Sequence, residues 1–225
     1  MRADRQSPNC GPRRDGARPD MVVIHYTAMA SAAAACDTLC NPATQVSAHY
    51  LIVQDGTLLS LVPEDLRAWH AGAGRWGAVS DVNSHSIGIE LANDGASPFA
   101  APLMDALEDL LRAIMPRWDI PPARVIGHSD MAPQRKIDPG PRFDWRRLAL
   151  QGLSVWPEAG QADPAGFAAG MRAFGYTATD DPDLLLQCFR LRFRPWARGP
   201  LDATDAGLIA DLARRFPVDA GGQAA

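Results

Sequence analysis

MVVIHYT, residues 21–27, is the most apolar of several short runs of β-branched and aliphatic residues in the first 130 positions. The others are HYLIVQ at 49–54, TLLSLV at 57–62, SIGIELA at 86–92 and RVIGH at 124–128. Runs of this length and composition are typical of β-strands. The dipeptide Asp55-Gly56 lies between the second run and the third, so it predicts a tight turn that makes these two strands an antiparallel hairpin.

Two segments, 30–40 and 98–118, carry apolar residues at helical spacing. In the longer segment the apolar stripe extends from Leu103 to Ile114, and acidic side chains occupy the opposite face. Because strands and helices are mixed along this part of the chain, we predict an α/β domain with a mixed central sheet flanked by helices.

The composition changes after Trp156, where PEAGQADPAG predicts a linker and no strand-like run follows. Three short helical segments come next, at 164–174, 182–193 and 204–216. About sixty residues form only a marginal core on their own, so we expect them to dock on the larger part. The predicted organisation is a large domain at 1–156 and a small three-helix domain at 164–218.

Composition excludes several classes of protein. The 225 residues are 47% hydrophobic and 21% charged, with a formal net charge of -4, which is typical of a soluble globular protein. The acidic balance argues against binding of nucleic acid through its phosphates, and no apolar run approaches the roughly 18 residues of a membrane span. The charged N-terminus lacks the apolar segment of a signal peptide, so we expect a cytoplasmic protein, or a periplasmic one if the start site is misassigned.

The stretch GHSDMAPQRKIDPGPRFDW, residues 127–145, suggests a metal site. His128 is expected at the end of a strand, and Asp138 follows it in a loop stiffened by prolines. A histidine and an aspartate held at neighbouring positions by a rigid loop can supply two metal ligands. His25 is the best candidate for a third, because an imidazole at the end of the most apolar strand would be costly to bury without a partner.

Two imidazoles and one carboxylate leave one tetrahedral position open for water, as in catalytic zinc sites. Glu90, a carboxylate in an otherwise apolar strand, is the expected proton carrier; the alternative is that it lies on a solvated face of that strand. Lys136 is the single lysine among 22 basic residues, which makes it a candidate for a site that needs a compact positive charge. Cys36 and Cys40 could pair on a metal, but the favoured interpretation is that they are small core residues.

Several motifs together carry a family resemblance. They are HYTA around His25, VSAHYLI around His49, WHAG around His70, SIGIEL around Glu90 and GHSDMAPQRKIDPG around His128. Together they resemble the zinc-dependent N-acetylmuramoyl-L-alanine amidases of the type 2 amidase family, over roughly residues 7–156. This implies the fold shared by T7 lysozyme and the peptidoglycan recognition proteins. The opening SPN and the C-terminal pattern FGY...FRLRFRP...GPLDATDAGLIADL are most similar to the AmiD branch, whose helical domain is peptidoglycan-binding-like.

The resemblance implies a role for each residue of the site. His25, His128 and Asp138 would bind one zinc ion per chain, Glu90 would deprotonate the attacking water, and Lys136 would stabilise the oxyanion.

The resemblance also bears on further residues. Trp69 and His70 would contact the substrate, whereas His49 would be structural and His85 would have no role. Ala48 stands where the family's phage member has a tyrosine, so that tyrosine's role does not transfer.

The implied reaction is hydrolysis of the amide between the lactyl group of N-acetylmuramic or anhydromuramic acid and L-alanine of the stem peptide, in cell-wall turnover or recycling. Muropeptides would be the partners. A peptidoglycan-recognition protein that binds without cleaving is the alternative, although non-catalytic relatives have lost metal ligands and this chain keeps every candidate. A zinc peptidase acting within the stem peptide would usually carry an HExxH pattern, which is absent.

Overall fold

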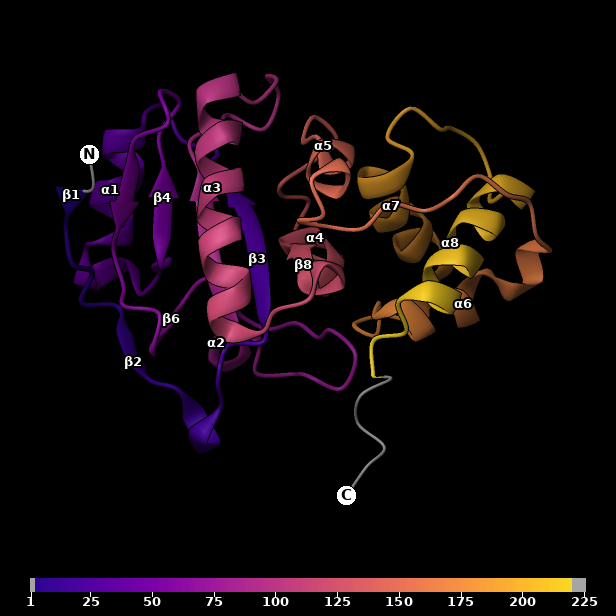
Figure 1. The fold of residues 1–225 in the computed structure, drawn as a ribbon, viewed down its shortest axis with the longest axis horizontal. Helices are drawn as coiled ribbons and strands as arrows, with labels where there is room; N and C mark the ends of the chain where they lie inside the picture. Colours follow the sequence, from indigo (N-terminus) through magenta and orange to yellow (C-terminus); the bar gives the residue numbers. More distant parts are fainter. Residues whose placement is uncertain (1–2, 220–225) are drawn as a thin grey trace.

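The computed structural model describes residues 3–219, and a six-stranded sheet forms its centre (Figure 1). The strands of this sheet are β1 Ala3–Asp4, β3 Met21–Tyr26, β4 Tyr50–Ile52, β5 Leu58–Ser60, β7 Ser86–Leu91 and β8 Val125–Gly127. Their order is β1-β5-β4-β7-β3-β8. The β4-β5 pair is antiparallel and the other neighbours are parallel, so the sheet is mixed, as predicted. A separate antiparallel pair joins β2, Cys10–Pro12, to β6, Leu66–Ala68.

Helices flank this sheet, which confirms the predicted α/β class. They are α1 Ala32–Leu39, α2 Val82–His85, α3 Ala101–Trp118, α4 His128–Met131, α5 Trp145–Leu150, α6 Phe167–Phe174, α7 Pro182–Phe193 and α8 Ala203–Arg215. Four 3₁₀ turns complete the described chain, at Arg14–Gly16, Pro42–Thr44, Pro122–Arg124 and Pro164–Gly166. Between residues 3 and 219, no helix is both long enough and apolar enough to cross a bilayer.

Each predicted strand run contains an observed strand, and the expected hairpin is β4-β5, in which Ile52 pairs with Leu58. The last run requires a correction, because β8 ends at Gly127 and His128 begins α4 instead of ending the strand. The Asp130 carboxylate accepts a hydrogen bond from the Gly127 N–H at 2.8 Å, which caps this short helix. The predicted pattern missed β1, β2, β6 and the short helices α2, α4 and α5, which are too brief to show periodicity.

Alternation along β3 assigns its side chains to two different cores. Val22 and Ile24 belong to the apolar cluster beneath α3, whereas Met21 and Val23 belong to a cluster on the opposite face. Because side chains alternate along a strand, His25 shares the face of Met21 and Val23. The histidine therefore faces away from α3.

The C-terminal helices α6, α7 and α8 lie beside β8 at one end of the sheet (Figure 1). Phe174, Phe189 and Phe193 from these helices join Val23 and Ile126 of the sheet in one continuous apolar cluster. The three helices occur where the sequence places them, and they dock on the larger part through this cluster. The division into domains at 1–156 and 164–218 stays a prediction.

A buried ion pair joins α7 to α4. Arg192 donates to Asp130 at 2.6 Å, and both side chains are only 1% exposed. Arg192 also donates to the Val125 carbonyl at 3.0 Å, and the Tyr176 hydroxyl donates to Asp130 at 2.6 Å. Its guanidinium stacks 4.2 Å from the ring centroid of Trp145. The C-terminal helices thus hold the carboxylate that caps the helix beginning at His128.

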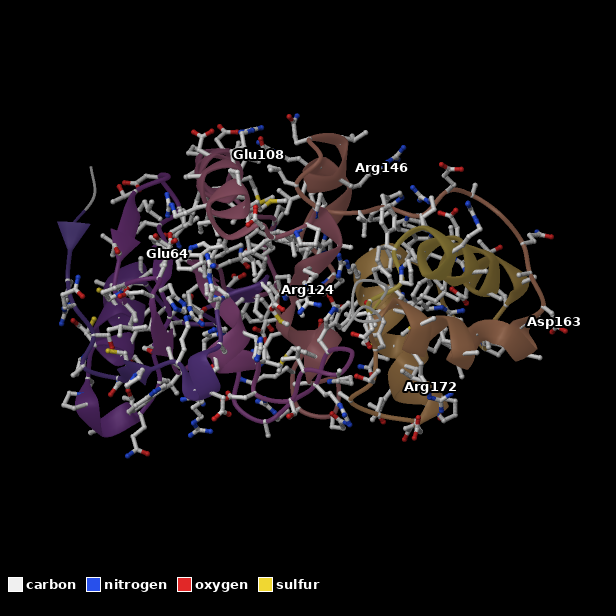
Figure 2. All side chains as sticks on the ribbon, turned by 60° about the horizontal axis from the view of Figure 1, so that its bottom comes forward. Glu64, Glu108, Arg124, Arg146, Asp163 and Arg172 are labelled. Carbon is white, nitrogen blue, oxygen red and sulfur yellow. The ribbon has the colours of Figure 1, made fainter. Side chains whose placement is uncertain are left out.

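Arg192→Met tests this contact, because it leaves a buried carboxylate without its cation. We expect the free energy of unfolding to fall by about 3–5 kcal/mol in urea denaturation. Arg172→Met is the matched control: its pair with Asp180 has the same 2.6 Å separation, but the side chains are 51% and 79% exposed (Figure 2). An exposed pair should contribute at most about 1 kcal/mol. Equal losses for the two variants would contradict the assignment.

Candidate metal centre and catalytic cleft

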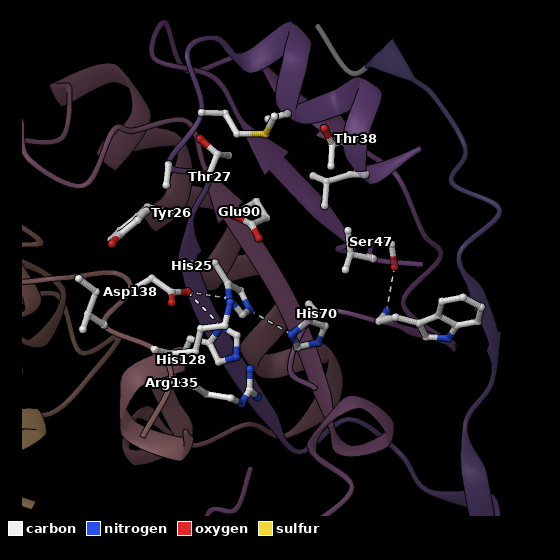
Figure 3. Close-up of a pocket in the computed structure, with 18 residues that line it drawn as sticks. His25, Tyr26, Thr27, Thr38, Ser47, His70, Glu90, His128, Arg135 and Asp138 are labelled. Atoms are coloured by element: carbon white, nitrogen blue, oxygen red, sulfur yellow. Dashed lines mark hydrogen bonds and ion pairs between the residues drawn. The ribbon is translucent and has the colours of Figure 1, made fainter. Parts of the chain in front are cut away.

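A cleft of about 390 Å³ opens where β3 and β7 end (Figure 3). All seven residues singled out in the sequence line it: His25, Trp69, His70, Glu90, His128, Lys136 and Asp138. Parallel strands bring their carboxyl ends to the same edge of a sheet, which gathers side chains that are far apart in the sequence. The register pairs His25 of β3 with Glu90 of β7, so both residues lie on the same face.

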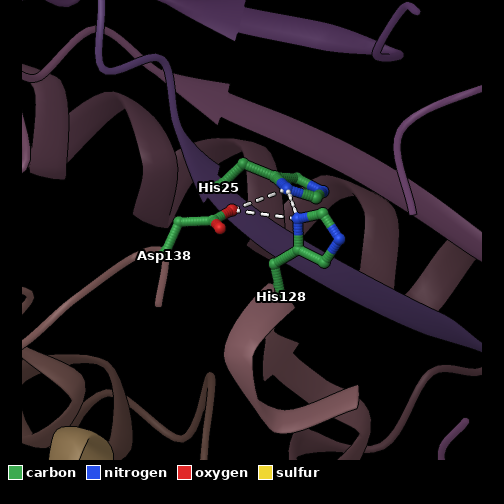
Figure 4. A group of neighbouring side chains, drawn as sticks. All are labelled: His25, His128 and Asp138. Atoms are coloured by element: carbon green, nitrogen blue, oxygen red, sulfur yellow. Dashed lines mark hydrogen bonds and ion pairs between the residues drawn. The ribbon is translucent and has the colours of Figure 1, made fainter. Parts of the chain in front are cut away.

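Three ligand-type side chains converge at the base of the cleft (Figure 4). His25 Nδ1 and His128 Nδ1 are 2.9 Å apart. Asp138 Oδ2 lies 3.0 Å from the first nitrogen and 3.1 Å from the second. The three residues are at most 7% exposed. Among residues 3–219 this is the group of histidine, cysteine and acidic side chains whose ligand atoms converge closely enough to hold a metal ion.

The hydrogen bonds of His128 show that this convergence needs a cation. Its Nε2 lies 2.9 Å from the Ala71 carbonyl oxygen, which can only accept a hydrogen bond. In the neutral imidazole Nε2 therefore carries the proton, and the lone pair of Nδ1 faces the Asp138 carboxylate. Two acceptors at 3.1 Å repel each other unless a positive charge lies between them. Two imidazole nitrogens and one carboxylate oxygen are a donor set that suits zinc.

The protonation states of the three residues also suit a metal. The pKa of His25 is lowered to about 4, chiefly by burial and also by the neighbouring His128. Burial opposes ionisation of Asp138, but the adjacent imidazoles of His128 and His25 keep the pKa of this carboxyl group well below its usual range. At neutral pH His25 is thus neutral and Asp138 ionised, as metal binding requires.

A closed loop brings Asp138 to His128. The Ser129 N–H donates to the Asp138 carbonyl at 2.9 Å, which joins the two ends of the loop. Pro139 packs against Gly127, where an added Cβ would lie 2.7 Å from the proline ring. Only a residue without a side chain fits there, so the glycine before His128 allows the loop to return.

Glu90 presents an unpaired carboxylate to the cleft. Its Oε2 atom is buried and has no hydrogen-bond partner. The pKa of Glu90 is raised to about 8, chiefly by burial and also by the nearby Asp138, while Lys136 acts in the opposite direction. An unpaired carboxylate of high pKa beside a metal site is suited to accepting and returning a proton.

Lys136 lies on the loop between His128 and Asp138 and lines the same cleft, half-buried. In the part of the chain that the structure describes, its ammonium group forms no ion pair with a carboxylate. Trp69 and His70 also line the cleft, and the Trp69 N–H donates to the Ser47 hydroxyl at 2.8 Å. Contact of these residues with substrate stays a prediction.

The other histidines and the cysteines have structural surroundings. His49 is fully buried, and its Nδ1 accepts a hydrogen bond from the Gly88 N–H at 2.9 Å. The side chain of His85 is 36% exposed and lies 3.8 Å from Asp20. Cys36 packs in the apolar cluster beneath α1, as the core interpretation expects.

Tyr26 and Arg135 are among the cleft residues that sequence reasoning missed. The Tyr26 ring lies against Gly95 and Gly140, where an added Cβ would come within 2.8 and 3.3 Å of it. The Arg135 guanidinium donates to the carbonyls of Ala71 and Ala73. Tyr26 is adjacent to His25 in HYT, and Arg135 is adjacent to Lys136 in QRK. Neither residue has a sequence spacing that marks it as part of the cleft.

The family model for N-acetylmuramoyl-L-alanine amidase, Amidase_2, matches residues 15–141, which include the whole cleft. The chain belongs to this amidase family. It is 34% identical to the N-acetylmuramoyl-L-alanine amidase AmiD of Escherichia coli (strain K12) over 242 residues, covering 90% of this chain and 85% of AmiD.

Solved amidase structures match both parts of the chain. The complex of AmiD from E. coli with the substrate anhydro-N-acetylmuramic acid-L-Ala-D-γ-Glu-L-Lys superposes with a TM-score of 0.81 and 32% identity, covering 94% of this chain and 93% of AmiD. AmpDh3 from Pseudomonas aeruginosa, in complex with anhydromuramic pentapeptide, gives a TM-score of 0.79 and 31% identity over 95% of this chain and 96% of AmpDh3. These coverages include the C-terminal helices of the amidase.

Asp138→Ala tests the metal centre, because it removes the only anionic donor of the three. We expect the purified variant to lose the metal that the wild-type protein retains after dialysis, as measured by mass spectrometry of the elements. His85→Ala is the control, since this histidine lies outside the cleft. Retention of one metal ion per chain by Asp138→Ala would contradict the site.

Proposed function

We propose that this amidase hydrolyses the amide between the lactyl group of N-acetylmuramic or anhydromuramic acid and L-alanine of muropeptides, with one zinc ion held by His25, His128 and Asp138. The convergence of these three acceptor atoms beside an unpaired carboxylate carries the proposal. The match to AmiD with an anhydromuramic substrate supports the choice of bond. The cytoplasmic location expected from the sequence stays a prediction.

Zinc at this position would lower the pKa of water toward 7 and polarise the scissile carbonyl. His25 and His128 supply neutral nitrogens, and Asp138 supplies the negative charge that offsets part of the charge of the ion.

Glu90 is the group that accepts and returns the proton. Its Oε2 atom faces the cleft without a partner, so it is free to take a proton from the attacking water. The same carboxyl group then gives the proton to the nitrogen of L-alanine, and the free stem peptide leaves. A pKa raised to about 8 lies near neutral pH, which suits a group that must first accept this proton and then return it.

Lys136 provides the positive charge for the oxyanion. The ammonium group lines the cleft without a carboxylate partner in residues 3–219, so its charge is available to the substrate. A fixed cation directed at developing negative charge lowers the barrier most where water is scarce. Trp69 supplies an aromatic wall of the same cleft, which suits contact with a sugar ring or the peptide.

Mass spectrometry of products tests the reaction directly. The purified protein, with its zinc content measured, is incubated with an anhydromuramyl tetrapeptide. We expect release of the free peptide by the wild-type protein, and at most trace release by Glu90→Gln or after chelation. Full zinc occupancy in Glu90→Gln would locate the defect in proton transfer. Binding of the muropeptide by zinc-loaded wild-type protein without release of peptide would show a recognition protein instead.

Lys136→Met tests the cation. Loss of one charged donor to an oxyanion is expected to cost about 2–4 kcal/mol of barrier, or roughly a thirtyfold to a thousandfold loss in kcat. Zinc content should be unchanged, because Lys136 is not a ligand. Near-normal kcat with zinc bound would contradict this role.

The pH profile gives a second measurement on the same variant. The base must be ionised, so kcat/KM should fall as the pH drops through the pKa of Glu90, which burial places above the usual value for glutamate. Lys136 lowers this pKa. In Lys136→Met the acid limb should therefore move to higher pH. An acid limb that stays in place would show that Lys136 does not act on Glu90.

A further inference from the structure

We infer that the segment His70–Ala71, together with Ser86, fixes the tautomers of both histidine ligands before any metal is bound. In this inference His70 is a positioning residue behind His25, in addition to lining the cleft. The inference rests on the proposed metal role of His25 and His128. It concerns their outer hydrogen-bond partners, which hold the ligands in place.

A chain of hydrogen bonds extends from His25 away from the metal centre, and Figure 3 shows its first link, between His25 and His70. His25 Nε2 lies 3.0 Å from His70 Nδ1. His70 Nε2 lies 3.1 Å from the Ser86 hydroxyl oxygen, and that hydroxyl lies 2.5 Å from the Val82 carbonyl oxygen. The chain thus ends at a backbone acceptor in α2.

The Val82 carbonyl at the end of this chain determines which atom donates and which accepts in each of its hydrogen bonds. The Val82 carbonyl can only accept, so the single hydroxyl proton of Ser86 is donated to it. Ser86 must then accept from His70 Nε2, which leaves His70 Nδ1 as an acceptor. His25 consequently carries its proton on Nε2, and its Nδ1 lone pair faces His128 and Asp138.

The same segment fixes the second ligand. His128 Nε2 donates to the Ala71 carbonyl at 2.9 Å, so the lone pair of its Nδ1 also faces the centre. Consecutive residues, His70 and Ala71, therefore act on different ligands: one through a side chain and the other through the backbone. Outer partners of this kind set the tautomer and ring orientation of metal-binding histidines.

The fold holds this segment from several sides. The Asn83 side-chain oxygen accepts from the N–H groups of both His70 and Ala71, at 3.0 and 2.8 Å. The His70 ring lies on Gly88 of β7, where an added Cβ would be 2.4 Å from the ring, so a larger residue at 88 would displace it. Arg135 donates to the Ala71 carbonyl from the opposite side. These contacts hold His70 and Ala71 in place without any ligand.

Nuclear magnetic resonance of the imidazole nitrogens tests the tautomers in zinc-free protein at neutral pH. In the wild-type protein we expect the proton of His25 on Nε2, with Nδ1 unprotonated. Ser86→Ala should yield a mixture of tautomers at His25 and His70. Ser84→Ala is the matched control, because this serine is also buried but bonds to Asp81 and Arg14 instead of His70. A single unchanged tautomer at His25 in Ser86→Ala would overturn the inference.

The affinity for zinc, measured by competition with a chromophoric chelator, is a second test of the inference. His70→Leu removes the acceptor and should weaken zinc binding by about 10–100-fold, the usual effect of losing an outer partner. His70→Asn keeps an acceptor near the position of Nδ1 and should recover most of the affinity. Wild-type affinity in a folded His70→Leu protein would overturn the positioning role. Absence of zinc binding in the wild type would defeat the proposed function alone, because the tautomer experiment needs no metal.

Discussion

Three hydrogen-bond acceptors meet at the ends of β3 and β8, with the nitrogens of His25 and His128 and one oxygen of Asp138 within 3.1 Å of each other. Such an arrangement is unfavourable without a cation, and burial makes it more so. Much of the surrounding structure maintains it. β3 pairs with neighbours on both sides, a loop closed by backbone hydrogen bonding returns Asp138, and a chain of hydrogen bonds orients each ring.

The C-terminal helices take part in this arrangement through one buried contact. Arg192 of α7 neutralises Asp130, and Asp130 caps the short helix in which His128 is the first residue. An ion pair this deeply buried is a weak source of net stability but a strong constraint on position. The helices also supply Phe174 and Phe193 to the core beneath the sheet. They thereby brace the short helix that carries His128, one of the three proposed ligands.

Periodicity and motif chemistry predicted the strands, the hairpin and the long helices, and all seven chosen residues line one cleft. Side-chain alternation alone could not place Glu90 on the cleft face, because that depends on the register between β3 and β7. The roles of Ser86 and Ala71 were not predictable either. One acts through another residue and the other through a backbone carbonyl, so neither leaves a pattern in the sequence.

We propose that the fold presents a preformed metal centre built from two Nδ1 atoms and one carboxylate oxygen. A crystal structure of the protein soaked in zinc, with anomalous data collected at the zinc absorption edge, tests it most directly. We predict one strong anomalous peak between His25 Nδ1, His128 Nδ1 and Asp138 Oδ2, with both rings still hydrogen-bonded to His70 and Ala71. Zinc bound through Nε2, or bound elsewhere in the protein, would contradict the account.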